Sequence, residues 1–124
     1  MPTPQKPRTF TFISRSAPYG NNRPRLCLDA ALATAVFEQK VNYLFMDDGV
    51  FQLLANQNAD GIASKTLGNA LETLELYGID QVMVLKESLA SRHISSEDLL
   101  FPVQLLSNSD LQSLIESSDY VINL

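Results

Sequence analysis

The sequence has few of the residues that build redox centres and metal sites. Its 124 residues include one cysteine, Cys27, one histidine, His93, and no tryptophan. A single cysteine excludes an internal disulfide and any metal site built from several thiolates of this chain. We therefore expect a protein of a reducing compartment that carries no metal ion and no other cofactor.

Long apolar runs and clustered positive charge are missing as well. No apolar stretch approaches the roughly 18 to 20 residues that span a bilayer. The first seven residues carry three prolines and lack the apolar segment of a secretory signal. The formal net charge is -5, whereas proteins that bind nucleic acid directly carry clusters of Lys and Arg. These absences predict a cytoplasmic protein that meets no membrane and, by itself, no nucleic acid.

What is present is the composition of an ordinary globular domain. The chain is 45% hydrophobic and 19% charged, well away from the composition of disordered proteins. Its length suits one hydrophobic core. We expect a flexible N-terminal tail over residues 1–8 and a single domain over residues 9–124.

Apolar segments rich in β-branched and aromatic residues alternate with helical patterns along the chain. Strands are predicted over residues 9–13, 41–46, 81–85, 101–106 and 120–124. Helices are predicted over residues 22–39, 64–77 and 110–116, with helical turns at 50–54 and 88–92. Gly78 stands where the second helix would end, and Ser107, Asn108 or Ser109 would cap the last one. The alternation predicts an α/β fold of three layers, with a largely parallel five-stranded sheet, helices on both faces and a flavodoxin-like strand order.

In such folds ligands bind at the carboxyl ends of the strands, where four loops of this chain fall. They cover residues 14–22, 47–49, 86–88 and 107–110. The first loop leads into a helix N-terminus, which favours anions, but it lacks the glycine spacing of a dinucleotide fingerprint and the Gly-Lys-Ser/Thr of a P-loop. We interpret it as a structural turn, with an anion- or nucleotide-binding loop as the alternative.

Three titratable side chains in or near these loops are candidates for metal binding or acid–base catalysis. Asp47 and Asp48 offer oxygen ligands for Mg²⁺ or an acid–base pair, yet neighbours in a strand point to opposite faces and Gly49 follows them. A turn is therefore expected, in which the carboxylates bind nearby N–H groups. His93 follows a polar Ser-Arg pair and is expected on the surface, because a functional histidine needs an orienting partner.

Cys27 is the one residue that allows a different interpretation. It lies in the first turns of the predicted first helix, near Arg23 and Arg25, and both a helix N-terminus and nearby cations lower the pKa of a thiol. Leu26 and Leu28 flank it, however, and free cysteine is among the most buried residue types. We expect a structural cysteine, with a reactive thiol as the alternative.

Several blocks of the sequence together resemble the TusC/DsrF family. They are Ser16-Ala17-Pro18-Tyr19-Gly20, Leu28-Asp29-Ala30, the run LFMDDGVFQL over residues 44–53 and the run SLASR over residues 88–92. The part from Asp47 to Leu53 is the most specific. The resemblance runs from about Thr9 to the final Asn123-Leu124, and it implies a DsrE-like α/β fold, in agreement with the strand and helix pattern.

The resemblance also implies a function. It implies a non-catalytic subunit of a TusBCD-type sulfur-relay complex, which supports 2-thiolation of the wobble uridine in tRNA. The implied partners are TusB/DsrH-like and TusD/DsrE-like subunits in a heterohexamer, a dimer of trimers, with a TusE/DsrC-like sulfur acceptor reached through the complex. The alternatives are a DsrF-type subunit of a cytoplasmic sulfur-oxidation complex and a sulfurtransferase that carries persulfide on Cys27.

The resemblance transfers no catalytic residue to this chain. In the TusD/DsrE subunit the sulfur-carrying cysteine lies near the end of the third strand, whereas residues 82–88 of this chain, VMVLKES, contain no thiol. A subunit without a carrier thiol would contribute to the shape of the complex. The apolar residues Val50, Phe51 and Leu53, with Tyr19 nearby, are therefore expected at a partner interface. The alternative is that they cover this domain's own core.

Overall fold

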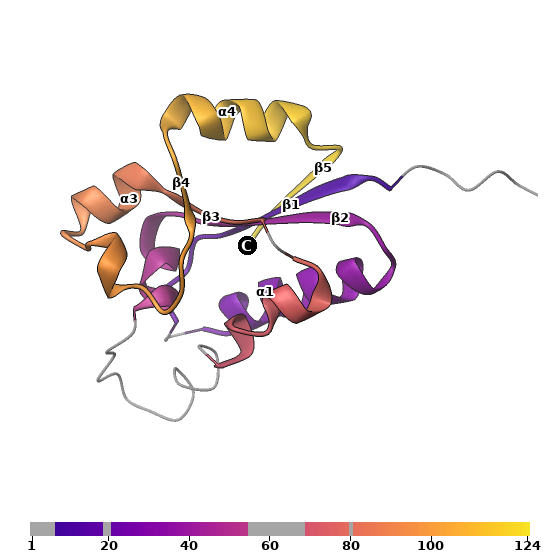
Figure 1. The fold of residues 1–124 in the computed structure, drawn as a ribbon, viewed down its shortest axis with the longest axis horizontal. Coiled ribbons are helices and arrows are strands. Elements are labelled where there is room, and N and C mark those ends of the chain that lie inside the picture. Colours follow the sequence, from indigo (N-terminus) through magenta and orange to yellow (C-terminus); the bar gives the residue numbers. More distant parts are fainter. Residues whose placement is uncertain (1–6, 19–20, 55–68, 80) are drawn as a thin grey trace, which may run out of the picture.

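The five predicted strands form one parallel sheet. The computed structural model describes residues 7–18, 21–54, 69–79 and 81–124. From edge to edge the sheet has the order β4-β3-β2-β1-β5, and every neighbouring pair is parallel. The strands are β1 (Thr9–Ser14), β2 (Lys40–Phe45), β3 (Gln81–Leu85), β4 (Gln104–Leu106) and β5 (Tyr120–Asn123). Helices cover both faces, so the predicted single-domain α/β class is confirmed (Figure 1).

The strand order corrects the prediction in one respect. A flavodoxin-like order, 2-1-3-4-5, would place β3 next to β1. Here β1 pairs with β2 and β5, while β3 pairs with β2 and β4. Strands and helices alternate along the chain in the same way in both orders. The sequence pattern therefore does not indicate on which side of the previous strand each new strand is added.

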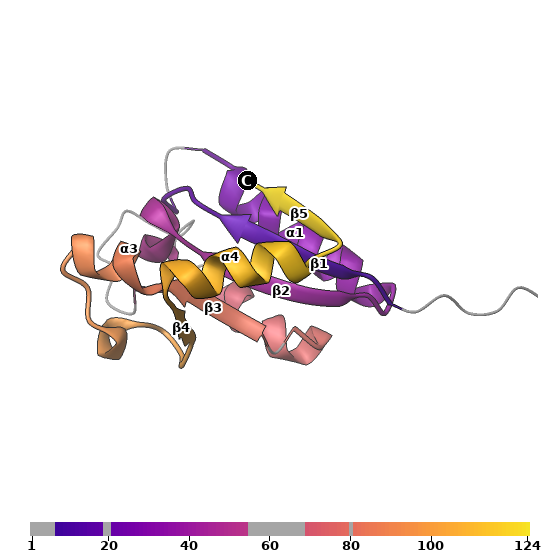
Figure 2. The same ribbon diagram turned by 90° about the horizontal axis from the view of Figure 1, so that it is seen from above.

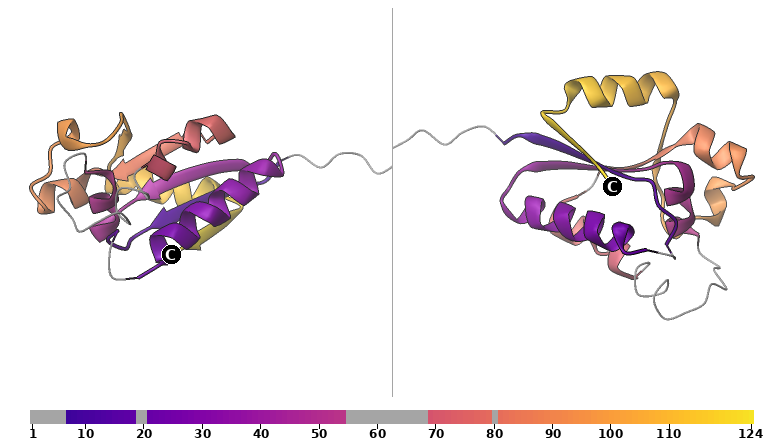
Figure 3. Two further views of the ribbon diagram at one scale, coloured as in Figure 1. Left: turned by 90° about the horizontal axis from the view of Figure 1, so that it is seen from below. Right: turned by 180° about the vertical axis from the view of Figure 1, so that it is seen from behind.

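The larger core lies between the sheet and helix α1 (Arg23–Val36). Alternate residues of β1 and β2 point to this face, among them Phe12, Tyr43 and Phe45, and they pack against Cys27 and Leu28 of the helix. The short 3₁₀ helix η2 (Leu74–Tyr77) lies beside α1 and covers the β3 side of the same face (Figure 3). All five of the named core side chains are buried to 2% exposure or less, which makes this the dominant apolar cluster of the fold.

Helix α4 (Asn108–Ser117) covers the opposite face and crosses the sheet from β4 to β5 (Figures 1 and 2). Its ten residues span about 15 Å at 1.5 Å per residue. The four strand spacings that it bridges amount to about 19 Å. Its contact with the sheet is a small apolar cluster, in which Leu111 and Leu114 pack on Ile13, Leu44 and Met83. This face is therefore held by fewer side chains than the α1 face.

The remaining elements are short helices at the ends of strands. They are the 3₁₀ helix η1 (Asp47–Leu53), the helix α3 (Lys86–Ser91) and the 3₁₀ helix η3 (Ser96–Asp98). The helix predicted over 64–77 begins outside the described residues; residues 69–71 are helical, η2 follows, and the chain leaves at Gly78 with φ 83°, as expected for a helix end. β4 is shorter than the segment predicted at 101–106, because pairing with β3 starts only after Pro102. Among the described residues, no helix is long and apolar enough to cross a membrane.

Candidate functional site

The loops after β1, β2 and β3 meet at the carboxyl edge of the sheet and are joined by hydrogen bonds. The N–H of Met46 donates to the carbonyl of Ser14 at 3.2 Å, which ties β2 to β1. The N–H of Asp47 donates to the Ser88 hydroxyl at 2.9 Å, which ties η1 to α3. Three of the four loops predicted at this edge are therefore brought together.

Gln52 is the buried centre of this network. Its Nε2 donates to the Ser14 hydroxyl at 2.7 Å and to the carbonyl of Ser16 at 2.8 Å. These two hydrogen bonds hold η1 against the end of β1 and the start of the first loop. The side chain is 2% exposed, and its Oε1 has no hydrogen-bond partner among the described residues. A buried amide with both donors used is a strong positional constraint, because losing it would leave a serine hydroxyl and a backbone carbonyl unpaired.

Gly49 allows η1 to approach β1 this closely. A Cβ on Gly49 would collide with the carbonyl oxygen of Ser14, and it would lie 2.8 Å from that carbonyl carbon and 3.2 Å from the Cα of Arg15. Glycine is therefore required here by space. Asp47, two residues earlier, adopts φ 52°, a left-handed conformation that aspartate tolerates better than most residues. In place of the separate turn expected from the Asp-Asp-Gly run, these residues form the start of η1, which begins at Asp47.

The two aspartates at the start of η1 bind arginines, whereas the sequence had suggested local N–H partners. Asp47 Oδ2 accepts from Arg15, with Nε at 2.8 Å and Nη2 at 2.7 Å. Asp48 Oδ1 accepts from Arg92, with Nε at 3.2 Å and Nη2 at 3.1 Å. The carboxylates thus diverge toward different elements, and both pairs are partly exposed, where such contacts contribute at most about 1 kcal/mol each. In the parts of the chain described, no group of three or more His, Cys, Asp or Glu residues could hold a metal ion.

The fourth loop, residues 107–110, serves helix α4. The Ser107 hydroxyl accepts from the N–H of Asp110 at 3.1 Å, and the Asp110 carboxylate accepts from the N–H of Ser107 at 3.1 Å. This reciprocal capping box selects Ser107 from the three caps considered, and the hydrogen bonds from Ser107 lower the pKa of the Asp110 carboxyl. Asn108 also donates to the Glu87 carboxylate at 2.5 Å, which links the start of α4 to α3.

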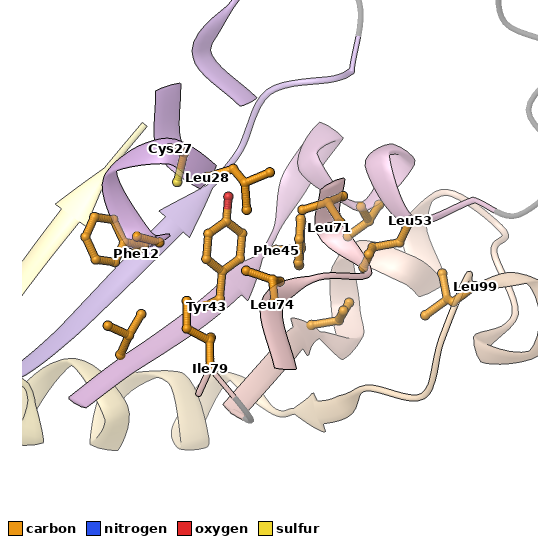
Figure 4. Close-up of a cluster of buried hydrophobic side chains, with 14 of the residues drawn as sticks. Phe12, Cys27, Leu28, Tyr43, Phe45, Leu53, Leu71, Leu74, Ile79 and Leu99 are labelled. Carbon is orange, nitrogen blue, oxygen red and sulfur yellow. The ribbon is translucent and has the colours of Figure 1, made fainter. Parts of the chain in front are cut away.

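Cys27 is completely buried on the sheet side of α1 (Figure 4). Burial raises the pKa of its thiol above the ordinary value of 9.0, and the nearby Tyr43 hydroxyl and Ser14 side chain offset only part of that rise. The helix start and the arginines that the sequence had suggested do not determine its protonation. A buried thiol with a raised pKa is neither a good nucleophile nor accessible to a protein partner.

Tyr43 lies against Cys27 with its hydroxyl directed toward the thiol (Figure 4). Its side chain is fully buried, and the hydroxyl has no hydrogen bond of ordinary length to any described residue. Burial, with a smaller contribution from Cys27, raises the pKa of Tyr43 well above its usual range. The pair is therefore two neutral groups in an apolar core at physiological pH.

The residues expected at a partner interface separate into two groups. Val50 and Leu53 are completely buried and belong to the core cluster under α1, so for them the structure replaces the interface expectation with the core alternative. Phe51 is only half-buried. Tyr19 lies outside the described residues. Phe51 is thus the member of the described group that a partner could reach.

His93 is exposed at the end of α3, with φ 56°, where a surface histidine was expected. Three members of the network, Gln52, Ser88 and Arg92, were not predicted from the sequence. Gln52 carried a usable signal, since it is the only polar residue in the run Val50-Phe51-Gln52-Leu53-Leu54. A lone polar side chain within a buried run usually has a fixed partner.

This edge is a hydrogen-bonded junction of three loops. Its hydroxyls, amide and ion pairs bond one another, and within the described ranges the only cysteine lies in the core and the only histidine on the surface. Such an arrangement holds three loops at fixed positions.

The comparison with known proteins assigns the family. Residues 8–124 match the model of the DsrE/DsrF-like family. The chain belongs to this family. A "Protein TusC homolog" of Vibrio parahaemolyticus is 35% identical over 92% of this chain and 97% of its own length, and one of Pseudomonas aeruginosa is 35% identical over 94% and 98%. An "Intracellular sulfur oxidation protein DsrF" of Allochromatium vinosum is 36% identical over 75% of this chain and 68% of its own length.

Two solved structures share the fold of this DsrE/DsrF-like chain. The ychN protein of E. coli superposes with a TM-score of 0.77 at 22% identity, over 94% of this chain and 99% of that one. Protein MTH1491 of Methanobacterium thermoautotrophicum, described as of unknown function, superposes with a TM-score of 0.64 at 15% identity, over 96% and 100%. At these identities the likeness concerns the fold alone.

Proposed function

We propose that this chain is a non-catalytic subunit of a sulfur-relay complex of the TusBCD type, which supports 2-thiolation of the wobble uridine in tRNA. The observation that carries the proposal is the match to TusC homologues over more than nine-tenths of both chains. Two features of the described residues support a non-catalytic role. Cys27 is sealed in the core, and Ser88 occupies the region after β3 where the resemblance places the carrier cysteine of the TusD/DsrE subunit.

In this proposal the chain contributes shape and partner contacts. Its partners are TusB/DsrH-like and TusD/DsrE-like subunits in a heterohexamer, and a TusE/DsrC-like acceptor receives sulfur through the complex. The hydrogen-bonded junction of η1 with β1 and α3 supports this role, because it presents Phe51 from a helix anchored by Gln52 and Gly49. A rigid, half-buried aromatic side chain is typical of the residues that concentrate binding energy at interfaces.

Removal of the only thiol tests whether this chain carries sulfur. In a strain whose own gene for this chain is replaced by the Cys27→Ala variant, 2-thiouridine in bulk tRNA, measured by liquid chromatography and mass spectrometry, is expected to stay within about twofold of wild type. Deletion of the gene is the control and is expected to abolish the modification. Loss of 2-thiouridine in the variant, with the protein present at its normal level, would reject the non-catalytic role and favour a persulfide on Cys27.

A charge at Phe51 tests the partner contact. The Phe51→Asp variant is expected to weaken copurification of the partner subunits with the tagged chain by at least about tenfold, because a desolvated aromatic contact is replaced by a charge. The Phe51→Leu variant, which keeps an apolar side chain, is the matched control and should retain most of the binding. Equal recovery of partners with both variants, at unchanged thermal stability, would remove Phe51 from the interface.

The relative named DsrF favours a second candidate, a subunit of a cytoplasmic sulfur-oxidation complex. This relative reaches 36% identity, although over a smaller part of the chain than the TusC homologues. The deletion strain separates the two candidates. Loss of tRNA 2-thiouridine supports the first, whereas normal tRNA with impaired growth on reduced sulfur compounds supports the second.

A further inference from the structure

A groove follows the β4 edge of the sheet. Two cavities, of about 480 Å³ and 450 Å³, adjoin along the segment that leads into β4, since both are lined by Phe101, Pro102 and Val103. The first extends toward η2, where Leu71, Leu74 and Ile79 form its floor, and the second extends along η3. The walls of the groove are therefore mostly apolar.

The strand beside this groove is open on one side. β4 is the outermost strand and pairs only with β3 among the described strands. Its sequence, Gln104-Leu105-Leu106, contains no charge, no proline and no positive-φ residue, and Leu105 is 39% exposed. Natural edges are usually blunted by lysines, prolines within the strand or bulges. An edge without these features is a template for adding an extended segment.

The charged residues that line the groove, in the part of the chain that the structure describes, all have the same sign. Glu72 and Glu75 line the first cavity and Glu97 lines the second, while the described lining residues include no Lys, Arg or His. None of the three carboxylates forms an ion pair with a described residue. An apolar groove lined by these three carboxylates is complementary to a segment that carries apolar anchors and positive charge.

We propose that the groove binds an extended segment of a partner protein that carries apolar residues and Lys or Arg, and that the segment adds a strand to the open edge of β4. Successive side chains of an added strand point to opposite sides. Since the apolar floor and the glutamates Glu72 and Glu75 line the same cavity, we expect both kinds of side chain among every second residue of the segment. Apolar side chains would contact Phe101, Val103 and the floor of the cavity, and basic side chains would reach the glutamates. The proposal goes beyond the sulfur-relay function and does not depend on which pathway the chain serves.

Synthetic ten-residue peptides test the proposal on the full chain. One peptide carries valine and lysine in turn at every second position, with serine between them, and in its control glutamate replaces each lysine. In NMR titrations of the isotopically labelled protein, the lysine peptide is expected to bind and to shift the amide signals of Gln104, Leu105 and Leu106 most strongly. Its Kd is expected to rise at least tenfold in the Glu75→Lys variant and to be unchanged in the matched Glu116→Lys variant on α4, which alters the net charge equally.

Three results would overturn the proposal. The first is equal affinity for both peptides, and the second is the largest shifts falling at the β5 edge in place of β4. The third is a concentration-dependent dimer of the free chain that Leu105→Asp abolishes and the peptide does not displace, because a second copy would then occupy the groove.

Discussion

The Gly49→Ala variant is expected to lose about 3 kcal/mol of unfolding free energy, measured by urea denaturation. The added Cβ would meet the backbone of Ser14 and Arg15, with the carbonyl carbon of Ser14 at 2.8 Å. Backbone atoms yield less readily than the end of a side chain, and Ser14 is fixed by the parallel pairing of β1 and by its bonds to Met46 and Gln52. We therefore expect η1 to shift away from β1, which weakens its contacts with the sheet.

Gly78→Ala is the matched control for this variant. Gly78 has φ 83°, which a residue with a Cβ adopts at a cost of about 1 to 2 kcal/mol. Apart from Gly78 and its two chain neighbours, no atom of the described residues lies within 4 Å of the added Cβ. Its replacement should therefore cost backbone strain without any collision. If Gly49→Ala destabilises the protein no more than Gly78→Ala does, the inference that the close approach of η1 to β1 requires glycine at position 49 is wrong.

Truncation of Tyr43 is expected to have the largest effect in the core. The Tyr43→Ala variant should lose about 3 to 5 kcal/mol, as other large aromatic truncations do. The ring is fully buried and packs on Phe45 at a centroid distance of 5.0 Å, beneath α1. A domain of this size has an unfolding free energy of about 5 to 15 kcal/mol in total. A large fraction of the variant molecules should therefore be unfolded near 37 °C. Circular dichroism during thermal unfolding measures the shift.

Tyr43→Phe should act in the opposite direction. It keeps the ring and removes a buried hydroxyl that has no hydrogen-bond partner among the described residues, so stability should stay constant or rise by about 1 kcal/mol. Because the folded pKa of Tyr43 is raised, its neutral form stabilises the fold below the ordinary value of 10.0, and this contribution is lost as the pH rises above it. The Tyr43→Phe variant should therefore lose less unfolding free energy than the wild type as the pH rises above 10.0. A destabilisation of more than about 1 kcal/mol at neutral pH would mean that the hydroxyl is bonded, with the Cys27 thiol as the nearest candidate.

Local patterns were sufficient to predict the elements that depend on neighbouring residues. The strand over 81–85, the helix end at Gly78 and a polar cap of the last helix within residues 107–109 all follow from propensities and hydrogen bonds within a few residues. The strand order did not follow, because it depends on which side of the sheet each crossover joins. The expected alternation is nearly the same for either side.

The candidate site depended on contacts between distant segments, and most of it was not predicted. Arg15 meets Asp47, and Arg92 meets Asp48, across 32 and 44 residues of sequence. One part could have been inferred locally. In a 3₁₀ helix, residues three apart lie on the same side, so Val50 and Leu53 share a face while Phe51 points elsewhere. The resemblance to the family supplied a function that no single side chain in this chain displays.

The position of β5 has a consequence for the order in which the chain can fold. β1 lies inside the sheet only because β5, from the other end of the chain, pairs with it; a hydrogen bond between Thr9 and Asp119 joins residues 110 positions apart. Until the helix α4 and β5 have been synthesised, β1 remains an unprotected edge strand. Pairing of such distant segments slows folding, because a long loop must close before any contact compensates its entropy. During synthesis, β1 therefore lacks one of its two neighbouring strands until β5 has been made.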